Sequence, residues 1–188
     1  DMLDRMTRAT HPDSSFKSFS YLSGNRSSVT NERNHITTYT YRSFGDPNER
    51  ELMQVTAPVA TANVSMTRNL LGQLTSATQN GKTRSYGYDT RFFLTSIVNP
   101  ETGTTVLGRD AVGNKISRQV GTSATVIYGY DNLDRLTSIT YPSGTSSVTQ
   151  IWDRNSKLKS VSNGAVRDYS YDGNGNLTGE TLTVGTLV

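Results

Sequence analysis

The chain repeats one short phrase at a nearly constant interval. Residues 86–89 and residues 128–131 read Tyr-Gly-Tyr-Asp, and residues 169–172 read Tyr-Ser-Tyr-Asp. A leucine follows each of these aspartates after five residues, at Leu94, Leu136 and Leu177. A repeat period of about 21 residues indicates that one small structural unit is copied along the chain, because periods of this length are typical of repeat arrays.

About nine copies fill the sequence when they are aligned on the position after the second aromatic residue. The aligned positions are Asp1, Leu22, Arg42, Thr67, Asp89, Asp110, Asp131, Asp153 and Asp172. We therefore expect one continuous array over residues 1–188, degenerate at 40–65 and best preserved at 85–180. The first residue is not methionine and falls inside a repeat, so we also expect a fragment of a larger protein.

Each copy predicts a β-hairpin. Aromatic residues at i and i+2 point to the same face of an extended strand. The aspartate that follows favours a turn, because its carboxylate can accept hydrogen bonds from nearby backbone amides. A second turn signal, such as the Asn-Gly pairs at 80–81 and 163–164, completes the unit. The prediction is an all-β protein, in which tandem hairpins of about 21 residues form a continuous antiparallel sheet strip.

Thirteen residues are the candidate structural anchors of the repeat. The tyrosines and Trp152 are expected to pack from unit to unit, with tyrosine pairs meeting across strands. The aspartates are expected to cap their turns, and Asp131 is expected to pair with Arg135. The anchors are Tyr86, Tyr88, Asp89, Asp110, Tyr128, Tyr130, Asp131, Arg135, Trp152, Asp153, Tyr169, Tyr171 and Asp172.

No catalytic, cofactor-binding or metal-binding residues are predicted. The aspartates recur once per unit, as a structural part does, whereas acid–base catalysis needs carboxylates that converge. His11 and His35 are far apart, and the chain has no cysteine to complete a zinc site. The Asp-Gly-Asn-Gly-Asn stretch at 172–176 begins like a calcium loop, but it is not followed by the glycine at the sixth position or by a glutamate at the closing position. A turn is therefore expected there.

The composition and charge of the chain limit the kinds of partner that we expect. Only 33% of the residues are hydrophobic, which favours a sheet with much of its surface in water over a thick core. The net charge of +3 comes from scattered residues, so no nucleic-acid partner is expected. No apolar run is long enough to insert into a membrane.

The phrases at 128–137 and 169–178, and more loosely the segment at 108–114, resemble the YD-repeat or Rhs-repeat family. The resemblance covers essentially the whole chain and is most specific from about Ser85 onward. It implies a β-strip that is part of a curved or hollow shell in a secreted or surface-exposed bacterial protein. In bacterial polymorphic toxins and insecticidal toxin complexes such a shell encloses a C-terminal effector, and in the animal teneurins a related barrel serves adhesion. The family's self-cleaving closing segment is not found in these residues, so that activity is not carried over.

Three functions follow as hypotheses. The first is a non-enzymatic shell segment whose partners are the rest of the parent polypeptide and an enclosed effector. The second is an extracellular adhesion or carbohydrate-binding module that uses exposed Tyr and Trp152 faces, with a glycan as partner. The third, an enzyme of unrecognised type, has no supporting constellation. Open strand edges further predict that the chain associates with copies of itself.

Overall fold

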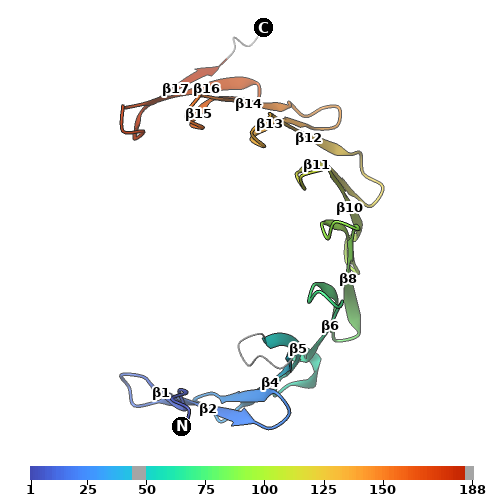
Figure 1. The fold of residues 1–188 in the computed structure, drawn as a ribbon, viewed down its shortest axis with the longest axis vertical. Helices are drawn as coiled ribbons and strands as arrows, with labels where there is room; N and C mark the ends of the chain where they lie inside the picture. Colours follow the sequence, from blue (N-terminus) through green and yellow to red (C-terminus); the bar gives the residue numbers. More distant parts are fainter. Residues whose placement is uncertain (44–49, 185–188) are drawn as a thin grey trace. The chain divides into compact units, whose positions relative to one another are not determined.

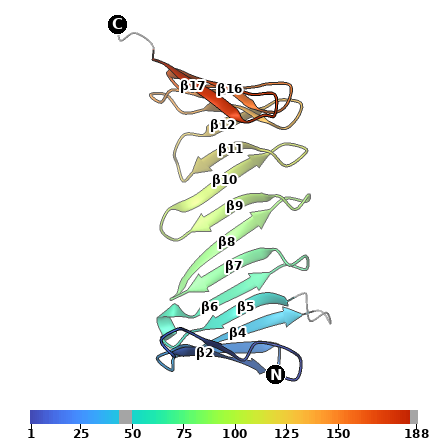
Figure 2. The same ribbon diagram turned by 90° about the vertical axis from the view of Figure 1, so that its left-hand side faces the viewer.

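The computed structural model describes residues 1–43 and 50–184. They form seventeen strands of one antiparallel sheet and a single 3-10 turn, so the predicted all-β hairpin strip is confirmed. Within the first unit, Figure 2 shows the strands between residues 50 and 79 lying side by side in the order of the sequence. No helix among the described residues is long and apolar enough to cross a membrane.

The chain divides into two compact units. The first comprises residues 1–87 with 98–100, and the second comprises residues 88–97 with 101–188. The first contains β1 (Arg8–Thr10), β2 (Phe16–Leu22), β3 (Arg26–Thr30), β4 (Ile36–Ser43), β5 (Arg50–Thr56), the 3-10 turn η1 (Ala60–Ala62), β6 (Val64–Arg68), β7 (Leu74–Gln79) and most of β8 (Lys82–Tyr88). Within this unit every strand pairs antiparallel with the next.

The second unit is built in the same way and holds the best copies of the repeat. It contains most of β9 (Leu94–Asn99), then β10 (Gly103–Arg109), β11 (Lys115–Val120), β12 (Val126–Tyr130), β13 (Leu136–Thr140), β14 (Val148–Trp152), β15 (Leu158–Ser162), β16 (Ala165–Tyr171) and β17 (Leu177–Val184). From β10 to β17 each strand pairs antiparallel with its successor. Figure 1 labels most of these strands along the chain.

The degenerate stretch predicted at 40–65 is only partly described. Residues 44–49 lie outside the described residues. Beyond them, β5 and β6 are joined by residues 57–63, which include η1. This connection is longer than the Asn80-Gly81 turn that joins β7 to β8.

A β-bulge recurs in six of the described antiparallel strand pairs. Opposite Gly129 and Tyr130 on β12 lie Ser138 and Leu136, so Thr137 is the extra residue on β13. The same skip occurs in five further hairpins. The skipped residues are Met53, Thr75, Ile116, Thr137, Lys159 and Thr178. The Leu-Thr pair that was predicted simply as strand is therefore a leucine opposite the second aromatic residue, followed by a bulge residue.

The two faces of the sheet differ in chemistry. In the second unit, Tyr128 lies opposite Ile139 and Tyr130 opposite Leu136, which places aromatic and aliphatic side chains on one face. On the other face Gly129 lies opposite Ser138, and the exposed Ile127 lies opposite Thr140. The expectation that tyrosines meet tyrosines across strands is wrong at these positions, because the residue opposite is aliphatic.

There is no thick core in the described part of the chain. Leu107 is the buried hydrophobic residue, and Ser28, Thr105 and Ser160 are the buried polar ones. No described side chain is fully buried. A one-layer sheet leaves both faces open, which explains why a sequence with only 33% hydrophobic residues can form it.

Candidate functional site

The repeated aspartate begins a turn of five residues, which we call a capped turn. In the turn at 131–135, the Oδ1 atom of Asp131 accepts hydrogen bonds from the backbone N–H groups of Leu133 at 2.9 Å and Arg135 at 3.1 Å. The backbone closes the same turn, since the N–H of Asp131 donates to the carbonyl oxygen of Arg135 at 3.0 Å. One carboxylate oxygen thus fixes the path of the turn.

The second carboxylate oxygen is held by a side chain of the same turn. Arg135 Nε donates to Asp131 Oδ2 at 2.8 Å, and the guanidinium also forms an ion pair with it at 2.7 Å. Asn114 Nδ2 contacts Asp110 Oδ2 at 3.0 Å, and Asn176 Nδ2 contacts Asp172 Oδ2 at 3.0 Å. In the turn at 89–93 the partner is Arg91, two residues after Asp89, at 2.8 Å.

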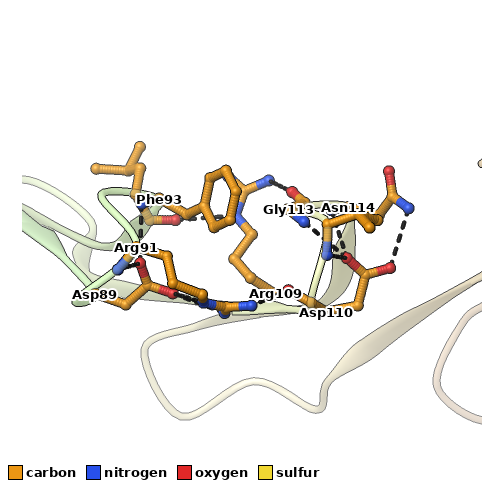
Figure 3. A network of polar contacts seen from close by, with 9 residues as sticks. Asp89, Arg91, Phe93, Arg109, Asp110, Gly113 and Asn114 are labelled. Atoms are coloured by element: carbon orange, nitrogen blue, oxygen red, sulfur yellow. Dashed lines mark hydrogen bonds and ion pairs between the residues drawn. The ribbon is translucent and has the colours of Figure 1, made fainter.

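Figure 3 shows two consecutive capped turns and the contacts between them. Arg91 reaches from its own aspartate to the carbonyl oxygen of Asp110 in the next turn, at 2.5 Å. Arg109 donates from Nε to the carbonyl oxygen of Leu94 at 3.0 Å and from Nη1 to that of Gly113 at 3.1 Å. The network therefore joins neighbouring repeats as well as the residues within each turn.

The residue directly before a capped turn, which we call the slot residue, carries this connection in several copies. Tyr130 donates its hydroxyl to the carbonyl oxygen of Lys115 at 3.1 Å, and Trp152 donates its indole N–H to that of Leu136 at 2.7 Å. Tyr171 does the same to Leu158 at 2.9 Å. In each case the acceptor is the residue immediately after the preceding capped turn. Through these hydrogen bonds, the slot residues connect their repeats to the preceding ones.

Arginine performs the same role where the aromatic residue is missing. The acceptor of Arg109, Leu94, is again the residue after the preceding turn. Arg68 in the first unit likewise donates from Nε to the carbonyl oxygen of Leu52 at 3.2 Å. A planar side chain with an N–H group can thus replace a tyrosine, because both can lie along the sheet and donate to the same carbonyl.

Sequence alignment alone misplaced three copies: Leu22 lies at the end of β2, Arg42 lies inside β4, and for the third copy it also missed the turn. Thr67 was aligned with the aspartates, but it lies inside β6. The turn begins instead at Asn69, whose Oδ1 accepts from the amides of Leu71 and Gln73, both at 3.0 Å. Asn31 caps a similar turn through Arg33 and His35 at 3.0 and 2.9 Å. The signal was present, because residues 69–75 read Asn-Leu-Leu-Gly-Gln-Leu-Thr, with asparagine in place of aspartate.

The first aromatic position of each phrase is half-buried on the sheet. Tyr128 lies with the Lys115 ammonium 4.2 Å from its ring centroid, and Tyr169 lies opposite Glu180. Tyr86 and Tyr88 are half-buried on β8.

Asp153 caps its turn by accepting hydrogen bonds from the backbone amides of Asn155 and Lys157, both at 2.8 Å.

The hydrogen bonds lower the pKa of several turn aspartates. For Asp131 the Arg135 side chain is the largest cause, and with the turn amides it outweighs the burial that raises the pKa. For Asp110, burial raises the pKa, but the bonds from Asn114, Gly113 and Val112 together exceed it. The pKa of Asp172 is lowered chiefly by Asn176. Burial raises the pKa of the Tyr130 hydroxyl, and the Asp110 carboxylate adds to that.

These shifts predict a loss of stability in acid. A carboxyl group whose pKa is lower in the folded state stabilises that state above the pKa of the unfolded chain, about 3.9, and loses this contribution as the pH falls through the folded pKa. We expect the midpoint of urea unfolding to fall more steeply below about pH 4 for the wild type than for Asp131→Asn. Asparagine cannot titrate and already caps turns at Asn31 and Asn69. Parallel pH profiles for the two proteins would contradict this prediction.

Comparison with known proteins agrees with this geometry. Residues 109–146 match the RHS Repeat family. The fold is similar to that of the TcdB2-TccC3 structure without its hypervariable C-terminal region, with a TM-score of 0.64 and 18% identity over 89% of this chain. It is also similar to the Photorhabdus luminescens Tc holotoxin pore, with a TM-score of 0.59 and 15% identity over 94% of this chain. No curated protein matches the sequence.

The chain spans about a tenth of the length of these structures, 10% of the first and 12% of the second. The matched segment at 109–146 contains the capped turn at 110–114, the turn at 131–135 and the slot residue Tyr130 between them. The sequence match and the fold together confirm the resemblance of this chain to the YD-repeat or Rhs-repeat family.

Proposed function

We propose that this chain is a structural wall segment of a YD-repeat or Rhs-repeat shell, and that the shell encloses a C-terminal toxin or effector of the same polypeptide. The observation that carries the proposal is a hydrogen bond between repeats. A slot residue such as Tyr130 or Arg109 donates it to the carbonyl oxygen of the residue that follows the preceding turn. This bond makes a single layer of sheet cohere from repeat to repeat without a core.

The thirteen predicted anchors are part of this proposal. The carboxylates of the turn aspartates accept hydrogen bonds from amides and side chains of their own turns, as that of Asp131 does from Leu133 and Arg135. Carboxylates used in this way are poorly placed for acid–base chemistry, which requires two groups that share a substrate. We therefore assign the segment a non-enzymatic role, in a secreted or surface-delivered bacterial protein.

The adhesion alternative is less well supported by the aromatic side chains. Tyr130, Trp152 and Tyr171 are half-buried, and their polar atoms already donate to the backbone of the preceding repeat. Stacking on a sugar ring needs an accessible aromatic face. These residues are better suited to packing between repeats.

Limited proteolysis of the parent polypeptide tests the shell. With the complete protein purified, we expect trypsin to cleave the region after this segment slowly, and to cleave it faster when Tyr130→Ala opens the wall. Leu133→Ala is the matched control, because Leu133 is 65% exposed at the tip of the same turn. Rapid cleavage of the downstream region in the wild type would contradict the proposal.

A further inference from the structure

The dipeptide Asn-Gly occurs three times in the chain, in two kinds of turn. At 80–81 and 163–164 it forms the tip of a hairpin, between β7 and β8 and between β15 and β16. At 174–175 it lies inside the capped turn at 172–176. Because the dipeptide is the same at all three places, a difference in its reactivity in the folded chain reports the turn around it.

An asparagine that precedes a glycine can lose its side-chain amide without an enzyme, which is one reason why asparagine is thermolabile. The backbone nitrogen of the glycine attacks Cγ of the asparagine and closes a five-membered succinimide ring. The proton of the glycine amide passes to the departing nitrogen, which leaves as ammonia. Water then opens the ring at either carbonyl group and yields aspartate or isoaspartate. The attack therefore needs a glycine N–H that can give up its proton and approach Cγ.

At the two hairpin tips the glycine nitrogen is accessible. Asn80 and Gly81 are exposed, their φ angles are 49° and 72°, and a Cβ atom at Gly81 would meet no heavy atom within 4 Å. Asn163 and Gly164 are exposed as well. Within the described residues, neither the N–H of Gly81 nor that of Gly164 has a hydrogen-bond acceptor. The nucleophile at these tips is thus unprotected.

In the capped turn the same nitrogen is held. The N–H of Gly175 donates to the carbonyl oxygen of Asp172 at 2.9 Å, and the carbonyl oxygen of Gly175 accepts from Lys157 Nζ at 2.8 Å. The N–H of Asn174 donates to Asp172 Oδ1 at 3.0 Å. Gly175 is also half-buried, whereas Gly81 is exposed. The hydrogen bond of Gly175 must break before its nitrogen can attack, and a bond of this kind slows such a step by about five- to tenfold.

We propose that Asn80 and Asn163 are sites of spontaneous deamidation in the folded chain, and that the capped turn protects Asn174. This assignment does not depend on the proposed shell, because it uses only the turns. Both products add a negative charge at the tip of a hairpin, and the main chain of isoaspartate carries one extra CH2 group.

The extra backbone atom matters most at Asn80. The turn there has two residues and joins Gln79 directly to its partner Lys82. A turn of this length fixes the register of its hairpin, so isoaspartate is expected to loosen the pairing beside it. That pairing includes the contact of 2.8 Å between the hydroxyl groups of Thr78 and Thr83.

Peptide mapping measures the three sites in one sample, because trypsin places them in different peptides, residues 69–82, 160–167 and 168–188. The chain is incubated at mildly alkaline pH, both folded and in urea, and the conversion of each asparagine is followed by mass spectrometry. The rates in urea report the sequence alone. We expect folding to slow the reaction of Asn174 at least about fivefold more than it slows the reactions of Asn80 and Asn163.

Asp172→Ala tests the protection directly. It removes the carboxylate that accepts from the amides of Asn174 and Asn176, so the turn loosens and Asn174 is expected to react about fivefold faster. Asp131→Ala is the matched control, because it removes the same cap from a turn two repeats earlier and should leave the rate at Asn174 unchanged.

Hydrogen exchange of the wild-type chain gives a reading that needs no variant, in case Asp172→Ala does not fold. The amide of Gly81 is expected to exchange at about the rate of an unfolded chain, and that of Gly175 at least about fivefold more slowly. An unreactive Asn80 in the folded chain overturns the proposal, as does equal slowing of Asn80 and Asn174 by folding. A rate at Asn174 that Asp172→Ala leaves unchanged, or unprotected exchange at Gly175, overturns it too.

Discussion

Tyr130→Ala is expected to lower the free energy of unfolding by about 2.5–3.5 kcal/mol. Full truncation of a buried aromatic residue costs about 3–5 kcal/mol, and Tyr130 is only half-buried, so about half of that applies. The lost hydroxyl bond to Lys115 adds about 1 kcal/mol. The two contributions are separable because the hydroxyl group stitches the repeats while the ring packs against Leu136.

Urea unfolding followed by the fluorescence of Trp152 measures this change. Trp152 is the only tryptophan, and it donates to the carbonyl oxygen of Leu136, the residue opposite Tyr130. Tyr130→Phe keeps the ring and is expected to lose only about 1 kcal/mol. A loss below about 0.5 kcal/mol for Tyr130→Ala would mean that the slot residue does not hold the repeats together.

The repeat period was sufficient to predict the hairpin strip but not the join between hairpins. Tyr-x-Tyr-Asp identifies a strand followed by a turn, because alternation along a strand and the capping of a turn are both local properties. The bond from Tyr130 to Lys115 joins residues from different hairpins, so it depends on how the sheet pairs. No pattern within one repeat specifies it.

Some copies of the repeat retain the hydrogen-bonding chemistry although the residue type has changed. Arg109 and Arg68 stand where tyrosine is expected, and Asn69 stands where aspartate is expected. Arginine keeps the hydrogen-bond donor that tyrosine provides, and asparagine keeps the acceptor oxygen that aspartate provides. An alignment guided by donor and acceptor capacity, rather than by aromatic identity, would have placed the turn at Asn69 and not at Thr67.

The bulge could not be predicted from the sequence either, for a physical reason. Thr137 follows a leucine in a segment with strong strand preference, and only the register against Gly129 and Tyr130 reveals that it is unpaired.

Gly113→Ala is expected to lower the free energy of unfolding by about 2–6 kcal/mol, the largest effect of any single methyl group we predict. Gly113 has φ +102°, whereas Asp134 and Ser156 at the same turn position have φ 58° and 59°, inside the left-handed region that other residues tolerate. The backbone conformation costs about 1–3 kcal/mol for an L-residue. A Cβ atom would also lie 2.5 Å from the ring of Phe93 in the preceding turn, and crowding of this kind costs about 1–3 kcal/mol.

Two matched variants divide the cost of Gly113→Ala into its parts. Gly121→Ala is the first control, because Gly121 has φ +54° and a Cβ atom there meets no heavy atom within 4 Å; its expected cost is about 1–2 kcal/mol. Phe93→Ala is the second, since it removes the ring that the new methyl group would strike. In a double-mutant cycle, Gly113→Ala should therefore cost less in the Phe93→Ala background than in the wild type, by about 1 kcal/mol or more. Equal costs in the two backgrounds would show that Phe93 does not pack on Gly113, and that backbone strain alone accounts for the loss.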